Sequence, residues 1–286
     1  MSEPQRTRLR ALLDSGQLVV APGVFDGLSA SLVARTGFRA AYMTGAGTSA
    51  SGFGLPDVGL LSQTEMAERA RVLTGVLGEV PLIADADTGY GAPLNIARTV
   101  REYERAGVAA LHLEDQAFPK KCGHLPDKEL VDTAEHVTKI RAAVDAREDE
   151  ATVVIARTDA RAPLGLDAAV ERANRYAEAG ADLLFVEAPR SGAEIERIAR
   201  EVTAPLLINV VQGGLTPDSP AEHLSALGYR VAIHPTALIN AAAGAMAGAL
   251  GELGGTGAGS LAPRTPQDLF NLVGLQEWSA FADRHA

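Results

Sequence analysis

Cysteine is almost absent from this chain of 286 residues, which holds a single one, Cys122. No intrachain disulfide can form, and a lone thiol is typical of a reducing, cytoplasmic compartment. Positive charge is also scarce, because 26 lysine and arginine residues are set against 36 acidic residues, for a net charge of −10. Nucleic-acid binding needs a basic patch, so this balance argues against a nucleic-acid partner, although it allows a locally basic pocket.

Long hydrophobic runs are missing as well. Residues 1–18 hold no apolar signal segment. The most membrane-like stretch, residues 238–251, is shorter than the roughly 20 apolar residues that a membrane span requires. Its alanine and glycine side chains instead predict a close-packed helix at a helix–helix or subunit contact. We therefore expect no membrane partner.

What the chain does contain is a regular series of short hydrophobic runs, typical of strands buried on both faces of a parallel sheet. The eight runs lie at residues 17–22, 40–45, 80–87, 108–115, 152–159, 181–188, 204–211 and 230–235. Helix-like segments lie between them, at 64–77, 95–107, 133–147, 167–180 and 193–202. The pattern predicts an α/β fold, a (β/α)8 TIM barrel forming one domain over residues 1–286. The alternative, a doubly wound dinucleotide-binding sheet, lacks its Gly-x-Gly-x-x-Gly motif after the first strand.

Two further helical stretches, 236–252 and 266–284, follow the last predicted strand, with a glycine-rich break at 251–260 between them. We expect extra C-terminal helices over about residues 236–286. The final helix either packs on its own barrel or reaches a neighbouring subunit.

Polar residues end seven of the predicted strands, where a barrel has its active site. They are Thr44 with Gly45, Ala46 and Gly47, then Asp85, Asp87, His112, Glu114, Asp115, Arg157, Asp159, Glu187, Asn209 and His234. Side chains two apart on a strand point the same way, so Asp85 and Asp87 should converge, as should His112 and Glu114. Clustered carboxylates favour a bound Mg²⁺, whereas the lack of Cys/His clusters argues against zinc. The alternative is a carboxylate network with Arg157 and no metal.

The segment after the fourth predicted strand, residues 116–132, is long for a barrel loop, and long loops are often lids. It carries Lys120, Lys121, Cys122 and His124 within five residues. Neighbouring cations lower the pKa of a thiol, so we expect Cys122 to be reactive. The alternative is an exposed cysteine without a role in a solvated basic loop.

Seven motifs together resemble the isocitrate lyase and phosphoenolpyruvate mutase superfamily, over about residues 18–245. They are Thr-Gly-Ala-Gly (44–47), GLPDVGLLS (54–62), ADADTGYG (84–91), LHLEDQ (111–116), KKCGH (120–124), IARTDA (155–160) and GGLTP (213–217). The KKCGH loop is similar to the carbon–carbon lyase branch, which includes methylisocitrate and 2,3-dimethylmalate lyases. Carboxyphosphonoenolpyruvate mutase has a similar loop, so phosphonate chemistry stays open.

The resemblance implies a TIM barrel, Mg²⁺ or Mn²⁺ as cofactor, a small 2-hydroxy or 2-oxo acid substrate, and homotetramers (dimers of dimers) with swapped C-terminal helices. It implies metal binding by Asp85, Asp87 and Glu114. The catalytic residues that it implies are Cys122, Arg157, Tyr42 and Asp57. The resemblance implies that Thr44, Gly45 and Ala46 offer backbone N–H groups to the substrate carboxylate. The other predicted substrate-binding residues are Lys120, Gly123, His124, Glu187 and Asn209, to which we add His234 for its place at a strand end.

Two departures from methylisocitrate lyases bear on the substrate. Asn209 is followed by Val-Val-Gln-Gly-Gly instead of x-Thr-Glu-Phe-Gly, and Asn240 stands where those enzymes place an arginine for a distal carboxylate. Each buried carboxylate needs a cationic partner, so a smaller, less charged acid such as a 2-substituted malate is expected.

The sequence thus predicts a Mg²⁺-dependent lyase that cleaves a 2-hydroxy di- or tricarboxylic acid to pyruvate, or a similar oxo acid, and a carboxylate. Cys122 is the expected proton donor, and the general base is left open between Tyr42 and a metal-bound water. The alternatives are P–C bond chemistry, an oxaloacetate hydrolase or decarboxylase, and an inactive binding subunit.

Overall fold

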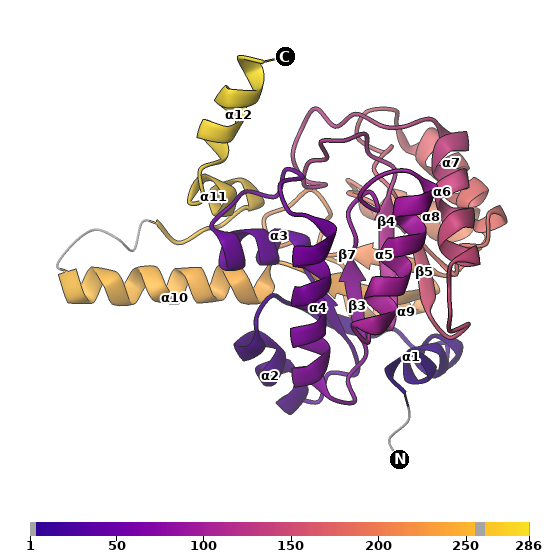
Figure 1. Ribbon diagram of the computed structural model, residues 1–286, viewed down its shortest axis with the longest axis horizontal. Coiled ribbons are helices and arrows are strands. Elements are labelled where there is room, and N and C mark those ends of the chain that lie inside the picture. The colour runs from indigo at the N-terminus through magenta and orange to yellow at the C-terminus, as the bar shows by residue number, and fades with distance from the viewer. Residues whose placement is uncertain (1–3, 255–260, 286) are drawn as a thin grey trace.

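Eight parallel strands close into a barrel, each paired with its neighbours in chain order (Figure 1). The computed structural model describes residues 4–254 and 261–285. The strands are β1 (Val19–Val24), β2 (Ala41–Met43), β3 (Leu82–Asp85), β4 (Ala110–Glu114), β5 (Val153–Thr158), β6 (Leu183–Val186), β7 (Leu206–Asn209) and β8 (Tyr229–His234). Every predicted run therefore overlaps a strand, and the predicted TIM barrel is confirmed.

Helices surround the barrel and extend beyond it. The five predicted between the strands are α4 (Gln63–Leu77), α5 (Pro93–Arg105), α6 (Thr133–Asp145), α7 (Leu166–Glu178) and α8 (Gly192–Glu201). Five further helices were not predicted, namely α1 (Gln5–Asp14), α2 (Gly27–Arg35), α3 (Gly45–Thr48), the π-helix η1 (Ser49–Phe53) and α9 (Ala221–Ala226). After β8 come α10 (Ala237–Gly254), α11 (Pro266–Asn271) and α12 (Leu275–Asp283).

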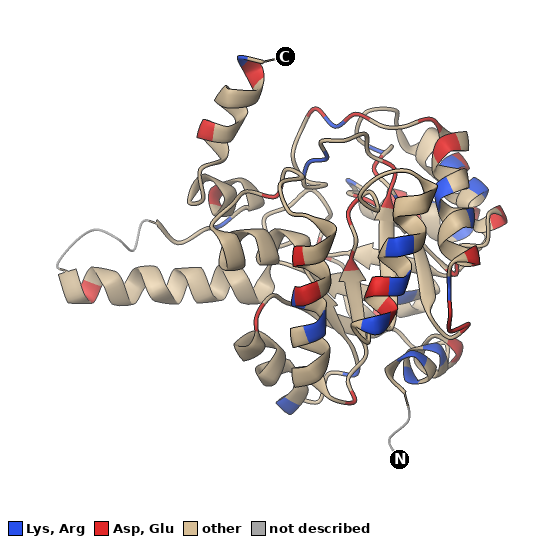
Figure 2. Cartoon of the chain, in the orientation of Figure 1, with Lys and Arg blue, Asp and Glu red and all other residues tan. Residues whose placement is uncertain are grey.

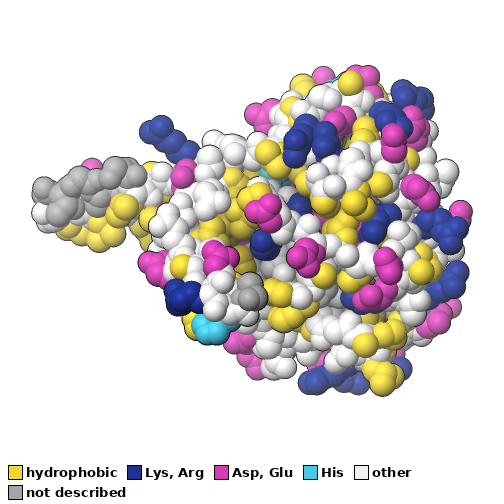
Figure 3. Space-filling model, turned by 90° about the horizontal axis from the view of Figure 1, so that it is seen from above, with side chains coloured by type: hydrophobic (Ala, Val, Ile, Leu, Met, Phe, Trp, Pro, Cys, Tyr) yellow, Lys and Arg dark blue, Asp and Glu magenta, His cyan; other side chains and the backbone are white. Residues whose placement is uncertain are grey.

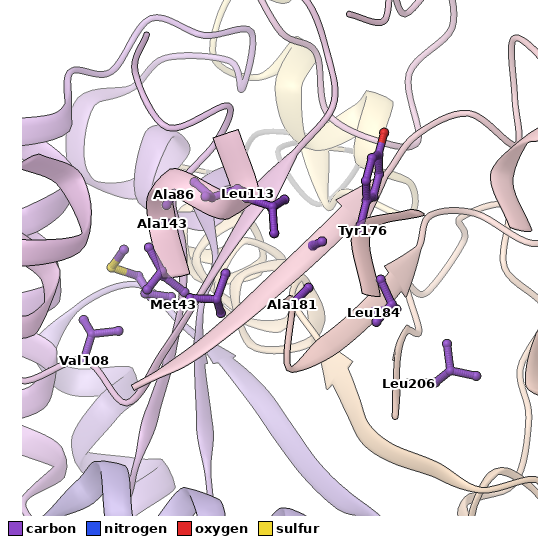
Figure 4. Packing of buried hydrophobic residues seen from close by; sticks show 14 of the residues in the cluster. Met43, Ala86, Val108, Leu113, Ala143, Tyr176, Ala181, Leu184 and Leu206 are labelled. Carbon is purple, nitrogen blue, oxygen red and sulfur yellow. The ribbon is translucent and has the colours of Figure 1, made fainter. Parts of the chain in front are cut away.

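Side chains alternate along each strand between the barrel interior and the layer under the helices. Ile83 and Phe185 belong to the interior cluster, which Leu9 of α1 joins at the N-terminal end of the barrel. Met43 and Leu184 instead pack outside the strands, in the layer that Figure 4 shows. This alternation decides which strand-end residues can reach a common site.

Helix α10 projects away from the barrel (Figure 1). Its one charged residue is Glu252, and Figure 2 shows the contrast with the charged helices around the barrel. Met246 and Leu253 are 60% and 86% exposed, and hydrophobic side chains line this part of the surface (Figure 3). The predicted helix is present. Within its own chain only Ile239, Asn240 and Ala247 of its residues are buried, so the predicted close packing, at another helix or at a subunit contact, stays a prediction.

By length and composition, α10 is also the one helix of the described residues that could cross a membrane, with a mean hydropathy of 1.2. The predicted helix over 266–284 is two helices, because the chain turns at Gly274, whose φ is 81°. Most of the predicted break at 251–260 lies outside the described residues.

Candidate active site

A small cavity of about 40 Å³ lies at the C-terminal ends of the strands. Eleven of the predicted site residues line it, namely Tyr42, Thr44, Ala46, Asp57, Asp85, Cys122, Gly123, His124, Arg157, Glu187 and Asn209. Val211, Pro235, Thr236 and Pro266 complete the wall. This volume holds a few water molecules and is far too small for a dicarboxylic acid, so the loop over residues 116–132 is closed in this structure.

The predicted metal-binding carboxylates lie close to the cavity, but not as the strand spacing suggested. Strand β3 ends at Asp85, and Asp87 follows in a left-handed turn with a φ of 47°. The backbone N–H of Asp87 donates to Asp85 Oδ1 at 2.9 Å, and that of Gly45 donates to Asp85 Oδ2 at 3.2 Å. The two aspartates are therefore joined by a turn and not by strand alternation. A left-handed aspartate is a strained backbone of the kind that gathers at functional sites.

Two cations already pair with these carboxylates. The ammonium of Lys120 contacts both Asp57 and Asp87, with its Nζ 2.6 Å from Asp87 Oδ1. Arg157 Nη1 lies 3.1 Å from Glu114 Oε2. Among the residues that the structure describes, no three Asp, Glu, His or Cys side chains form a ready-made metal cluster. Lys120, predicted to bind substrate, instead lies among the predicted metal ligands.

The chemistry of this donor set nevertheless fits a divalent cation with oxygen ligands. Burial, with the negative charges of Asp85 and Asp57, raises the pKa of Asp87 to about 7. Burial also raises the pKa of Glu114 well above its usual range, although Arg157 opposes the shift. A raised pKa means that these buried carboxyl groups are costly to ionise without a further positive charge, which a divalent cation such as Mg²⁺, held by oxygen ligands, would supply.

His112 also lies at the site. The sequence predicted its position at the end of a strand but assigned it no role. Its Nε2 lies 2.7 Å from the hydroxyl of Tyr42 and 3.5 Å from Asp85 Oδ1. Burial lowers the pKa of His112 to about 4, so the imidazole is neutral at pH 7. Burial and Asp85 raise the pKa of Tyr42 well above its usual value. Tyr42 is thus a hydrogen-bond donor here, and its phenol is poorly suited to act as the general base.

Four other residues that line the cavity, Arg157, Glu187, His124 and Asn209, form one hydrogen-bonded group. His124 Nδ1 accepts the backbone N–H of Leu215 at 3.0 Å, which leaves its Nε2–H to donate to Glu187 at 3.1 Å. Asn209 donates to both oxygens of Glu187 at 3.2 Å, and Arg157 Nη2 lies 3.6 Å from the same carboxylate. The structure therefore brings these four predicted residues together.

The expected contribution of residues 44–46 is partly wrong. Their backbone N–H groups were expected to bind a substrate carboxylate. The N–H of Thr44 instead donates to Val24 at 3.2 Å, and that of Gly45 donates to Asp85. Thr44 and Ala46 still line the cavity, so they remain candidates for substrate contact through other atoms.

His234 is the clearest misplacement. On β8, Val231 and Ile233 belong to the barrel interior, whereas Ala232 belongs to the outer layer. Alternation therefore turns His234 outward, and the cavity is lined instead by Pro235 and Thr236. A substrate contact through His234 is not supported. Because side chains alternate along a strand, the inward position of the hydrophobic Ile233 is the signal that could have corrected this prediction.

The expected low pKa of Cys122 is also wrong. Burial, with the negative charge of Asp57, raises the pKa of this thiol to about 12. Lys120 is turned to Asp57 and Asp87, and the ammonium of Lys121 binds the carbonyl oxygen of Asp127 at 2.9 Å. The neighbouring cations are therefore engaged elsewhere, and Cys122 is a neutral thiol with its backbone N–H on the Asp57 carbonyl at 3.0 Å.

Alkylation of Cys122 should accordingly be slow. With the thiol raised to a pKa of about 12, the thiolate fraction stays low through neutral and mildly basic pH. We expect iodoacetamide to modify the folded protein much more slowly than the urea-unfolded chain at the same pH, as measured by intact mass. Equal rates in the two states would show that the thiol is exposed and unperturbed.

Comparison with known proteins agrees with this geometry. The family described as Phosphoenolpyruvate phosphomutase matches residues 9–253. The chain belongs to this family. It is 51% identical over 239 residues to 2,3-dimethylmalate lyase of Eubacterium barkeri, covering 84% of this chain and 82% of that enzyme. It is 45% identical to probable 2-methylisocitrate lyase 2 of Corynebacterium glutamicum, covering 88% and 82% of the two chains.

Solved structures give the same result. A crystal structure of 2,3-dimethylmalate lyase superposes with a TM-score of 0.86 at 41% identity, covering 100% of this chain and 96% of that one. A phosphonopyruvate hydrolase complex with oxalate and Mg²⁺ superposes with a TM-score of 0.77 at 32% identity, covering 99% of each chain. The predicted superfamily and the predicted assignment as a carbon–carbon lyase are confirmed by these similarities.

Proposed function

We propose that this member of the phosphoenolpyruvate phosphomutase family is a Mg²⁺-dependent lyase that cleaves a substituted 2-hydroxy dicarboxylic acid of the malate type. One observation carries the proposal, namely a small cavity that the carboxylates of Asp57, Asp85 and Glu187 line together with Arg157 and with Cys122 of the lid. A cytoplasmic location belongs to the same proposal and is supported by the single cysteine and by the relatives, which are metabolic enzymes.

The wall of the cavity supports a substrate with few charges. Val211, Pro235, Thr236 and Pro266 form part of this wall, and none of them carries charge. The hydroxyl of Thr236 has no hydrogen-bond partner within the described chain, so it is free to contact a ligand. A third carboxylate buried against this wall would lack a cation, whereas an alkyl group would pack against it. Dicarboxylates with alkyl substituents fit better than tricarboxylates.

Each of these residues has a separate role in the proposed reaction. Arg157, fixed by Glu114 and Glu187, pairs with a substrate carboxylate, while Asp85, Asp87 and Glu114 would hold Mg²⁺. When bound, the metal supplies Lewis-acid polarisation of the 2-oxygen. Solvent water takes the hydroxyl proton, the C2–C3 bond breaks to give an oxo acid, and the electron pair of that bond stays on the departing carboxylate fragment as an enolate. The protonated thiol of Cys122 then gives C3 a proton.

Release of pyruvate or a homologous oxo acid tests this function. We expect Mg²⁺-dependent cleavage of 2-alkylmalates such as 2,3-dimethylmalate, with kcat/KM at least about tenfold higher than for methylisocitrate, because an unpaired buried carboxylate is costly. The panel also includes isocitrate, oxaloacetate and phosphonopyruvate. Turnover of oxaloacetate or phosphonopyruvate with no malate cleavage would favour the alternative chemistries and overturn the proposal.

We also propose a homotetramer assembled through residues 237–283. The support is the exposed hydrophobic surface of α10, where Met246, Leu250 and Leu253 are at least 59% exposed, and of α12, where Phe281 is 53% exposed. Light scattering should give four times the chain mass, and Leu250→Glu should shift the protein to smaller species. A monomer at micromolar concentration that keeps its activity would contradict this assembly.

A further inference from the structure

Lys128 is a buried lysine that lies outside the cavity and has no role in the proposed reaction. Its side chain is only 1% exposed. Its Nζ donates to Asp159 Oδ1 at 2.8 Å and also to the backbone carbonyl of Gly123. An ammonium is costly to bury unless it is paired and hydrogen-bonded, so these two contacts are what keeps the charge in place.

Asp159 links this lysine to the cavity arginine. The carboxylate is fully buried, and it accepts Arg157 Nε at 2.9 Å and Arg157 Nη2 at 3.0 Å. Such a paired, fork-shaped contact fixes the plane of a guanidinium as well as its position. One carboxylate therefore holds Arg157 on one side and Lys128 on the other.

The second contact of Lys128 fixes the lid. Gly123 follows Cys122 directly, and a Cβ atom at Gly123 would collide with Arg157 Nη2 and with the side chain of Glu187. The backbone of the lid thus rests on Arg157 with no space between them. By holding the Gly123 carbonyl, Lys128 ties the position of the lid to that of the arginine beneath it.

We propose that Lys128 is a positioning residue that fastens the closed lid and thereby places Cys122 and Arg157 for catalysis. The lid has to open in each turnover, because the closed cavity of about 40 Å³ cannot admit a substrate. The catalytic effect of this positioning by Lys128 rests on the proposed lyase function. The mechanical part, fastening of the lid that carries Cys122, does not depend on which reaction the enzyme performs.

Alkylation of the single cysteine measures lid opening directly. In Lys128→Met the stem is kept and the ammonium is lost, so we expect iodoacetamide to modify Cys122 at least about tenfold faster, the scale of losing a hydrogen bond to a charged group. Lys121→Met is the matched control, because Lys121 lies in the same lid and, among the described residues, its ammonium donates only to the Asp127 carbonyl. Its alkylation rate should stay close to that of the wild type.

The steady-state parameters complete the test. We expect kcat of Lys128→Met to fall at least about tenfold while Lys128→Arg, which keeps the charge, recovers most of the activity and the slow alkylation. An unchanged alkylation rate in a Lys128→Met protein with wild-type circular dichroism would overturn the proposal. If that variant does not fold, Lys128→Gln is measured under the same criterion. A wild-type protein without lyase activity would refute the proposed function and leave the alkylation comparison intact.

Discussion

Asp85→Asn should lower Mg²⁺-dependent turnover by at least about 1000-fold, because both the proposed cation and the developing charge on the substrate depend on this carboxylate. Asparagine keeps the size of the side chain, but its single amide oxygen can replace only one of the two carboxylate oxygens that accept the N–H groups of Gly45 and Asp87. Circular dichroism of the variant therefore has to show a wild-type fold before the loss is assigned to the missing charge. Coupled assays of oxo-acid release over a Mg²⁺ titration measure it.

Asp14→Asn is the matched control for this experiment. Asp14 is an exposed carboxylate at the end of α1, at the other end of the barrel from the cavity. Its substitution should leave kcat unchanged. Full activity of the wild-type enzyme after exhaustive treatment with a chelator would contradict the metal assignment, whatever the result for Asp85→Asn.

Cys122→Ser should lower kcat by at least about 100-fold with little change in KM, since general acids contribute about 10²–10⁴-fold to catalysis. Serine is nearly the same size but far less acidic, so it returns the proton to C3 poorly. The high pKa of Cys122 keeps the thiol protonated at pH 7, which is the state that a donor needs. Single-turnover measurements of oxo-acid formation and of solvent deuterium incorporation separate bond cleavage from protonation.

Thr216→Val is the control for this experiment, because it removes a buried hydroxyl that does not line the cavity. Its kcat should stay near the wild-type value. Near-normal kcat in Cys122→Ser would instead make the thiol a bystander, and the oxaloacetate and phosphonate alternatives would then gain support.

The barrel could be predicted from the sequence because burial of a parallel strand on both faces leaves a short hydrophobic run that survives in the linear chain. Helices that leave no comparably clear hydrophobic pattern in the sequence were not predicted. Helix α9 has six residues, and α2 is held by a capping box between Asp26 and Ser29 rather than by a long hydrophobic stripe. The separation of α11 from α12 depends on the left-handed Gly274.

The site was predictable as a set of residues but not as a set of contacts. Strand parity brought Arg157, Glu187 and Asn209 to one cavity and, used consistently, would have turned His234 outward. The pKa of Cys122 could not be predicted, because sequence proximity to Lys120 does not show that its ammonium binds Asp57, 63 positions away. Nor does the sequence show the left-handed turn at Asp87, which replaces the expected strand spacing.

The close contact between Gly123 and Arg157 has a kinetic consequence. A packed backbone of this kind is either seated or displaced, since tightly packed contacts have few intermediate arrangements. Two products of the proposed cleavage must leave a cavity of about 40 Å³, and we expect their release to require displacement of that contact. If release is slower than bond breaking, kcat should fall as solvent viscosity rises.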